Sequence, residues 1–144
     1  ERRRQPIGGP MVHVLLPVDG SQGSARAVRM VIALCLRLAP VGITLLHVEV
    51  ADGVADERLA NAAPPSKGND PLASAKAMLD QAGLPYATET RQGYVASSIV
   101  DCAKAINCDA IVMGTRGLGS TGELLGSVAR QVITLADVPV TLVK

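Results

Sequence analysis

A glycine-rich segment, residues 113–127, contains the side chains and backbone best suited to hold a phosphate. It reads Met-Gly-Thr-Arg-Gly-Leu-Gly-Ser-Thr-Gly-Glu-Leu-Leu-Gly-Ser. Glycines let backbone N–H groups approach an anion closely, and a following helix adds a partial positive charge. Arg116 can add a charge-assisted hydrogen bond and Ser127 a hydroxyl. The segment therefore predicts a phosphate-binding turn, with a plain flexible turn as the alternative.

Two familiar phosphate-binding motifs match this segment only in part. Gly117-Leu-Gly-Ser-Thr-Gly122 satisfies the dinucleotide fingerprint, but the acidic residue at the expected distance, Asp137, precedes its strand instead of ending it. The same glycines begin like a P-loop, but Glu123 stands where that motif needs a lysine. We reject both motifs.

Few other residues of the sequence suggest chemistry. Asp19 ends an apolar run, where its carboxylate could accept hydrogen bonds from an adenine or a ribose; a favourable charge at a helix start is the alternative. His13 and His47 lie in predicted strands and are interpreted as structural histidines with hydrogen-bond partners. No catalytic triad or carboxylate pair is apparent, so no catalytic residue and no metal ligand is predicted.

The elements that must position these residues alternate between strand and helix. Apolar runs and turn residues predict strands at 11–18, 43–48, 86–91, 110–113 and 138–143, and helices at 22–38, 70–83, 95–106 and 127–136. This alternation is typical of an α/β domain with a parallel sheet covered by helices on both faces. Ligands of such sheets bind at the carboxyl ends of the strands.

Local signals refine three of these elements. Ser21 is expected to cap the first helix, which should bury a face formed by Ala25, Val28, Ile32 and Cys35. Asp70-Pro71 is expected to start the second helix. The third strand is polar, which indicates a place near the sheet edge.

Length and composition describe one domain, residues 11–144, after a flexible N-terminal arm or expression remnant at residues 1–10. The chain has two tyrosines and no other aromatic residue, and its formal net charge is +1, so neither a nucleic-acid nor a membrane partner is expected. The longest apolar run, residues 30–36, is too short to cross a bilayer. Three cysteines without metal-ligand spacing predict reduced thiols and a cytoplasmic location.

Five separated motifs give a more specific indication. They read Val18-Asp19-Gly-Ser21, Leu45-Leu-His-Val48, Ile111-Val-Met-Gly-Thr-Arg-Gly117, Leu125-Gly-Ser-Val128 and Val138-Pro-Val140. In this order they resemble the universal stress protein family over residues 11–144. The resemblance implies a Rossmann-like, five-stranded parallel sheet with strand order 3-2-1-4-5.

The resemblance also implies an adenine-nucleotide site. Pro17, Val18, Asp19 and Val48 would surround the adenosine, Met113, Gly114 and Gly117 would form the floor, and Gly126, Ser127 and Val128 would meet the phosphates. Members that bind ATP carry nine residues between the second and third glycines of their motif. Here eight residues separate Gly117 from Gly126.

These observations predict a nucleotide-binding domain that serves in a stress response as a sensor or regulator. The ligand would be ATP or AMP, with ADP also compatible and Mg²⁺ an optional companion of the phosphates. A dimerising interaction module without nucleotide is the leading alternative, and a slow ATPase is a further one. We also expect a homodimer formed through residues 138–143, and a mobile lid at residues 49–69.

Overall fold

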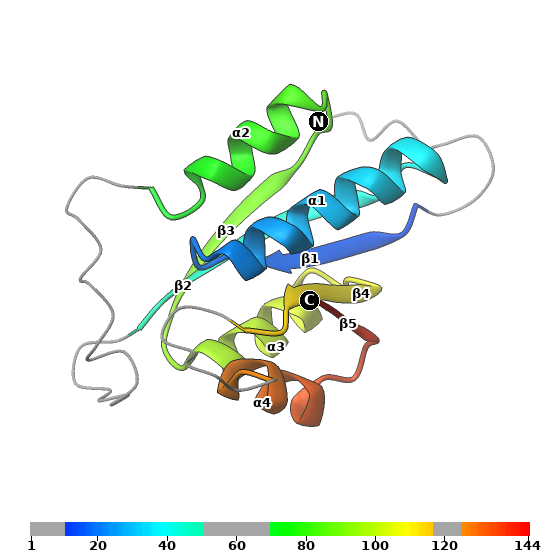
Figure 1. The fold of residues 1–144 in the computed structure, drawn as a ribbon. Helices are drawn as coiled ribbons and strands as arrows, with labels where there is room; N and C mark the ends of the chain where they lie inside the picture. The colour runs from blue at the N-terminus through cyan, green and yellow to red at the C-terminus, as the bar shows by residue number, and fades with distance from the viewer. Residues whose placement is uncertain (1–10, 51–69, 117–124) are drawn as a thin grey trace.

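The computed structural model describes residues 11–50, 70–116 and 125–144 (Figure 1). The predicted N-terminal arm and most of the predicted lid lie outside these ranges. Strands and helices alternate along the chain in this order: β1 (His13–Pro17), α1 (Gln22–Arg37), β2 (Gly42–Glu49), α2 (Ala73–Gln81), β3 (Ala87–Gln92), α3 (Val95–Ala105), β4 (Ala110–Gly114), α4 (Ser127–Leu135) and β5 (Val140–Val143). The predicted alternation is therefore confirmed.

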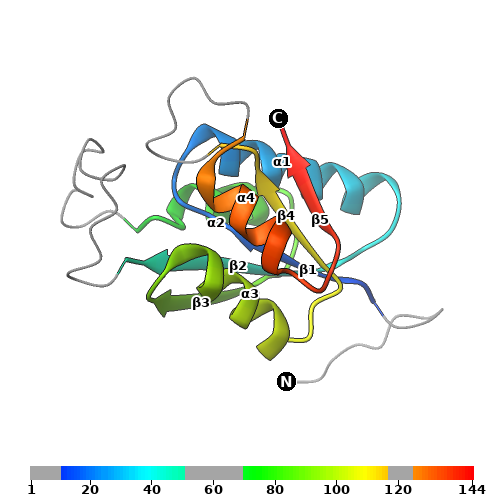
Figure 2. The same ribbon diagram turned by 90° about the horizontal axis from the view of Figure 1, so that it is seen from below.

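The strands form one parallel sheet in the order β3-β2-β1-β4-β5. Helices α1 and α2 cover one face of this sheet, and α3 and α4 cover the other (Figures 1 and 2). Both the predicted fold class and the predicted strand order are confirmed. The polar strand β3 forms one edge, as its composition indicated, and β5 forms the other.

The core consists of two aliphatic layers, one on each face of the sheet. Consecutive residues of β1 show the division: Leu16 packs into the layer under α1 and α2, whereas Leu15 packs into the layer under α3 and α4. Both leucines are completely buried. This alternation is the two-residue period of a strand that is covered on both sides.

Helix α1 begins as predicted but buries a different face. Ser21 is its N-cap, and the Ser21 Oγ accepts a hydrogen bond of 3.2 Å from the Ser24 backbone N–H. The buried residues of the helix are Gly23, Ser24, Ala27, Val28 and Val31. The predicted face is therefore wrong by about one position. Gly23, Ser24 and Ala27 let the start of the helix approach the sheet closely, while Ile32 and Cys35 pack at the side of the buried face.

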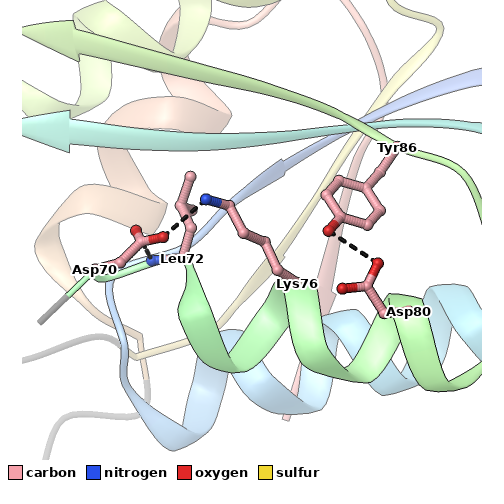
Figure 3. A network of polar contacts seen from close by, with 5 residues as sticks. All are labelled: Asp70, Leu72, Lys76, Asp80 and Tyr86. Carbon is pink, nitrogen blue, oxygen red and sulfur yellow. Dashed lines mark hydrogen bonds and ion pairs between the residues drawn. The ribbon is translucent and has the colours of Figure 1, made fainter.

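Helix α2 begins later than predicted. Asp70 does not cap it, because its carboxylate accepts a hydrogen bond of 2.9 Å from the Leu72 backbone N–H in the turn before the helix. The other carboxylate oxygen pairs with Lys76 Nζ at 2.7 Å, as Figure 3 shows. Further along the same helix, the Tyr86 hydroxyl donates to Asp80 at 3.0 Å and ties α2 to the start of β3.

Strand β5 is shorter than predicted. It pairs with β4 from Val140, whereas residues 138 and 139 precede the strand. Pro139 has no backbone N–H to contribute to a ladder, although its carbonyl accepts from the Ile111 N–H at 2.9 Å. Within the described ranges no helix is long and apolar enough to cross a bilayer.

Candidate functional site

The candidate site lies where two neighbouring strands send their connections to opposite faces. β1 and β4 pair side by side, yet β1 leads into α1 on one face and β4 leads into α4 on the other. The carboxyl ends of the two strands and the amino ends of the two helices consequently meet at the carboxyl end of the sheet. In open parallel sheets such a divergence is the usual position of a ligand.

The turn from β1 into α1 is held by the Asp19 carboxylate. Asp19 Oδ1 accepts hydrogen bonds from the Ser21 backbone N–H at 2.9 Å and from the Ser24 Oγ at 3.1 Å. Gly20, between Asp19 and Ser21, has a φ of +82°, which glycine adopts without strain. At least one oxygen of Asp19 therefore stabilises the turn into α1. This finding supports a structural role of Asp19 at the helix start, in addition to the predicted contact with a ligand.

Two glycines bring α1 against the end of β4. A Cβ atom at Gly114 would lie only 2.7 Å from the carbonyl carbon of Gly23, and a Cβ at Gly23 would collide with the Arg116 carbonyl oxygen. Gly114 thus has a packing role that the sequence reasoning did not assign. Gly23 was missed altogether, although a glycine in the first turn of a helix, where alanine would favour helix formation, is a visible signal.

The connection from β4 to α4 is closed at its base. The Gly126 backbone N–H donates to the Thr115 carbonyl oxygen at 2.7 Å, and the Thr115 N–H donates to the Val143 carbonyl oxygen at 3.1 Å. The first bond joins the two ends of the glycine-rich segment, and the second fixes one end to β5. Gly117 and the other glycines up to residue 122 lie outside the described residues.

Helix α4 starts directly at this closed base. Its N-cap is Gly126, which has extended backbone angles and no side chain with which to cap the first amides. Ser127 is the first helical residue and is therefore not the cap. The helix has no acidic residue in its first turn. Its amino end is thus a partial positive charge without a carboxylate from its own first turn, a suitable place for an anion.

The other predicted ligand residues surround this end of the sheet but differ in how far they are buried. Val18 and Met113 are 7% and 6% exposed and belong to the two core layers. Pro17, Val48 and Val128 are half-buried, and Arg116 is exposed at the end of β4. The strand order places the end of β2, with Val48, beside the end of β1.

The two histidines differ in how well they are satisfied. His13 Nε2 and the Thr44 hydroxyl share a hydrogen bond of 2.7 Å, which confirms its structural role. Among the described residues the buried Nδ1 of His47 has no hydrogen-bond partner, so the same prediction is wrong for this atom. Within the described residues no cluster of histidine, cysteine, aspartate and glutamate side chains could hold a metal ion.

Comparison with known proteins assigns the fold to a family. Residues 11–144 match the Universal stress protein family. The chain belongs to this family. A universal stress protein of Synechocystis sp. is 34% identical over 131 residues, which cover 90% of this chain and 83% of the relative. A universal stress protein of Methanocaldococcus jannaschii is 33% identical over 137 residues, which cover 91% of this chain and 81% of the relative. The resemblance predicted from the five motifs is thereby confirmed.

Solved structures agree with this assignment. The hypothetical protein MJ0577 superposes with a TM-score of 0.74 at 26% identity, covering 92% of this chain and 94% of its own. A universal stress protein from Archaeoglobus fulgidus, solved in complex with dAMP, superposes with a TM-score of 0.66 at 26% identity. The match covers 94% of this chain and 98% of the relative. This universal stress protein therefore shares its whole fold with a relative that binds an adenine nucleotide.

Proposed function

We propose that this universal stress protein binds an adenine nucleotide at the carboxyl ends of β1 and β4, with the phosphates at the amino end of α4. The observation that carries the proposal is the start of α4 at Gly126, which has no side-chain capping bond and is held against Thr115 by a 2.7 Å hydrogen bond. A fixed helix start without an acidic side chain in its first turn favours an anion. The dAMP complex of the Archaeoglobus fulgidus relative supports the class of ligand.

The adenosine would lie between the Asp19 turn and Val48. The hydrogen bonds from Ser21 and Ser24 to Asp19 fix this turn before any ligand arrives, so little conformational entropy would be lost on binding. Because the side chains of Val18 and Met113 are buried, these two residues would contribute backbone groups and the floor of the site.

The number of phosphates follows from the glycine segment. With one residue fewer between Gly117 and Gly126 than in ATP-binding members, we infer a tighter cradle that favours AMP or ADP over ATP. We further propose that the bound nucleotide makes the domain a sensor or regulator in a stress response; its three free thiols favour a cytoplasmic location. Slow ATP hydrolysis would require a metal ion and a base that positions water.

Calorimetry with AMP, ADP and ATP, each with and without Mg²⁺, tests this proposal. The Arg116→Gln variant should bind more weakly than the wild type, whereas Arg130→Gln removes another exposed arginine, from α4, and should bind normally. If millimolar AMP, ADP and ATP all fail to bind the wild type, the proposal is wrong and the domain is an interaction module.

We also propose that two copies pair through β5. This strand is a sheet edge of largely apolar residues, and an uncovered apolar edge tends to recruit another strand. Helices α1 and α4 both contact β5, and α4 carries the exposed apolar side chains Ile133 and Leu135, at 47% and 49% exposure. A second copy related by a two-fold axis would extend the sheet with an antiparallel strand pair.

Sedimentation equilibrium tests this pairing. Thr141→Lys places a charge at an exposed position of β5 and should give a monomer. Thr88→Lys places the same charge at an exposed position of β3, the opposite edge, and should leave the dimer intact. A wild-type protein that sediments as a monomer at micromolar concentration would overturn the proposal.

A further inference from the structure

Helix α1 carries basic residues and no acidic ones. Between Asp19 and Glu49 the sequence contains three arginines, all in α1, and no acidic residue. The formal net charge of the whole chain is only +1, because acidic residues elsewhere offset these arginines. The expectation that no membrane partner exists was based on this total, which conceals a local excess of positive charge.

The three arginines point away from the sheet. Arg26, Arg29 and Arg37 are exposed, and their spacings of three and eight residues keep them on one side of a helix. That side is opposite to the buried Ala27, Val28 and Val31. Among the described residues no carboxylate lies within ion-pair distance of any of the three guanidinium groups.

Exposed apolar side chains accompany the arginines. Met30, Leu34 and Leu36 are 43%, 42% and 66% exposed. A large part of each of these side chains therefore remains in water. Together with the arginines they form a surface, here called the basic face of α1, that is both cationic and apolar.

We propose that the basic face of α1 docks on an anionic lipid bilayer. Arginine forks pair with the phosphate oxygens of lipid headgroups, and leucines at the same surface can enter the boundary between headgroups and acyl chains. The arginines lie on the outer side of a single helix, which is convex. A convex surface can dock on a broad, deformable bilayer, whereas a partner helix would need a groove. The hollow lined by Val100, Cys108 and Val138 belongs to the opposite face of the sheet.

Nucleic acid is a poorer match to this face, because α1 has no aromatic residue on which a base could stack and its exposed leucines would remain in water. The inference uses no residue of the nucleotide site. It therefore stands or falls independently of the proposed function.

Vesicle co-sedimentation of the full chain tests the inference. Vesicles of phosphatidylcholine with about 30% phosphatidylglycerol should pellet the protein at low salt and release it near 1 M salt, where the Debye length falls to about 3 Å. Vesicles of phosphatidylcholine alone should not pellet it. Replacing Arg26, Arg29 and Arg37 together by glutamine should lower the partition coefficient by about a hundredfold.

Two further variants separate charge from apolar contact and from general effects. Replacing Leu34 and Leu36 together by serine should weaken binding to anionic vesicles while the salt dependence remains. Replacing Arg130, Lys104 and Lys144 together by glutamine removes the same charge from exposed positions outside α1 and should reduce binding far less. All of these positions are exposed, so circular dichroism should show the same fold for every variant.

Three results would overturn the proposal: no pelleting of the wild type with anionic vesicles at low salt, equal pelleting of the α1 and control glutamine variants, or equal pelleting with neutral vesicles. Polyglutamate and duplex DNA serve as competing polyanions. If either binds the wild type with the same salt dependence while the vesicles do not, the basic face serves an acidic macromolecule and the membrane assignment is wrong.

Discussion

The backbone N–H of Gly126 lies 2.7 Å from the carbonyl oxygen of Thr115 and donates a hydrogen bond to it. This bond closes the glycine-rich segment at its base, so the start of α4 is positioned by the end of β4. Thr115 is in turn bonded to Val143 of β5. The candidate phosphate site is therefore linked through two backbone hydrogen bonds to the strand that we propose as the dimer interface.

The contact between Gly23 and Gly114 should be sensitive to a single methyl group. Gly114→Ala would place its Cβ 2.7 Å from the Gly23 backbone, and overpacking of this kind typically costs about 1–3 kcal/mol. Gly42→Ala in β2 is the control, since its nearest neighbour would be a flexible methionine methyl at 3.4 Å. Urea denaturation should show a clear loss of stability only for the first variant. Equal midpoints would mean that α1 can shift away from β4 without cost.

Ser21 and Ser127 stand at the starts of two helices but should respond differently to alanine. Ser21→Ala removes the N-cap of α1 and should lower the free energy of unfolding by about 0.5–2 kcal/mol. Ser127 is not the cap of α4, so Ser127→Ala should change stability by less than about 0.5 kcal/mol. If it binds phosphate, calorimetry with AMP should nevertheless show weaker binding. A large stability loss in Ser127→Ala would contradict this reading of the helix start.

The three cysteines should react with a thiol reagent in a fixed order. Burial raises the pKa of both the Cys102 and Cys108 thiols, which lowers the fraction of reactive thiolate. Cys35 is only half-buried. Alkylation of the native protein at pH 8, followed by mass spectrometry, should label Cys35 first and the other two only after unfolding. Early labelling of Cys108 would contradict the core packing described under α3 and α4.

The pair between Asp70 and Lys76 should give a pH-dependent contribution to stability. The hydrogen bond from Lys76 holds the pKa of Asp70 below its ordinary value, and the same bond raises the pKa of Lys76. The contribution is therefore present above the ordinary pKa of the aspartate and lost as the pH falls through the lower folded value. At the alkaline end it is lost as the pH rises through the raised pKa of Lys76.

Urea midpoints of the wild type and of Lys76→Gln should accordingly differ at pH 7 and converge near pH 2. The effect should be small and weakened by salt, because both side chains are partly exposed. Lys104→Gln is the matched control: its partner Asp137 is 3.5 Å away and both side chains are more exposed, so its midpoint should hardly change. A Lys76→Gln difference that persists unchanged at pH 2 would exclude the ion pair as its cause.

The order of the elements could be predicted because every strand except the polar β3 contains a short apolar run, and because turn residues separate the elements. The position of Asp70 shows the limit of this reasoning. An aspartate followed by a proline signals a helix start, but the sequence does not reveal whether the carboxylate caps the helix or the turn before it. Its bond to the Leu72 N–H moves the start of α2 to Ala73.

The candidate site was predictable to a similar degree. The glycine segment and the Asp19 turn could be found from residue type and spacing, since both follow apolar strands. The contact between Gly23 and Gly114 could not, because it joins two residues that are far apart in sequence and depends on how closely α1 approaches β4. The same close approach explains why small residues such as Ser24 and Ala27, and not the larger Ile32, form the buried face of α1.

The place of α1 at the β5 side of the sheet determines how many copies of its basic face one particle would present. Antiparallel pairing of two β5 strands has its two-fold axis perpendicular to the sheet, so both copies of α1 lie on the same side of the extended sheet. Six arginines would then face one plane. Once one copy has docked, the second meets the membrane at a high effective concentration, so residence on the membrane would rise steeply with dimerisation through avidity.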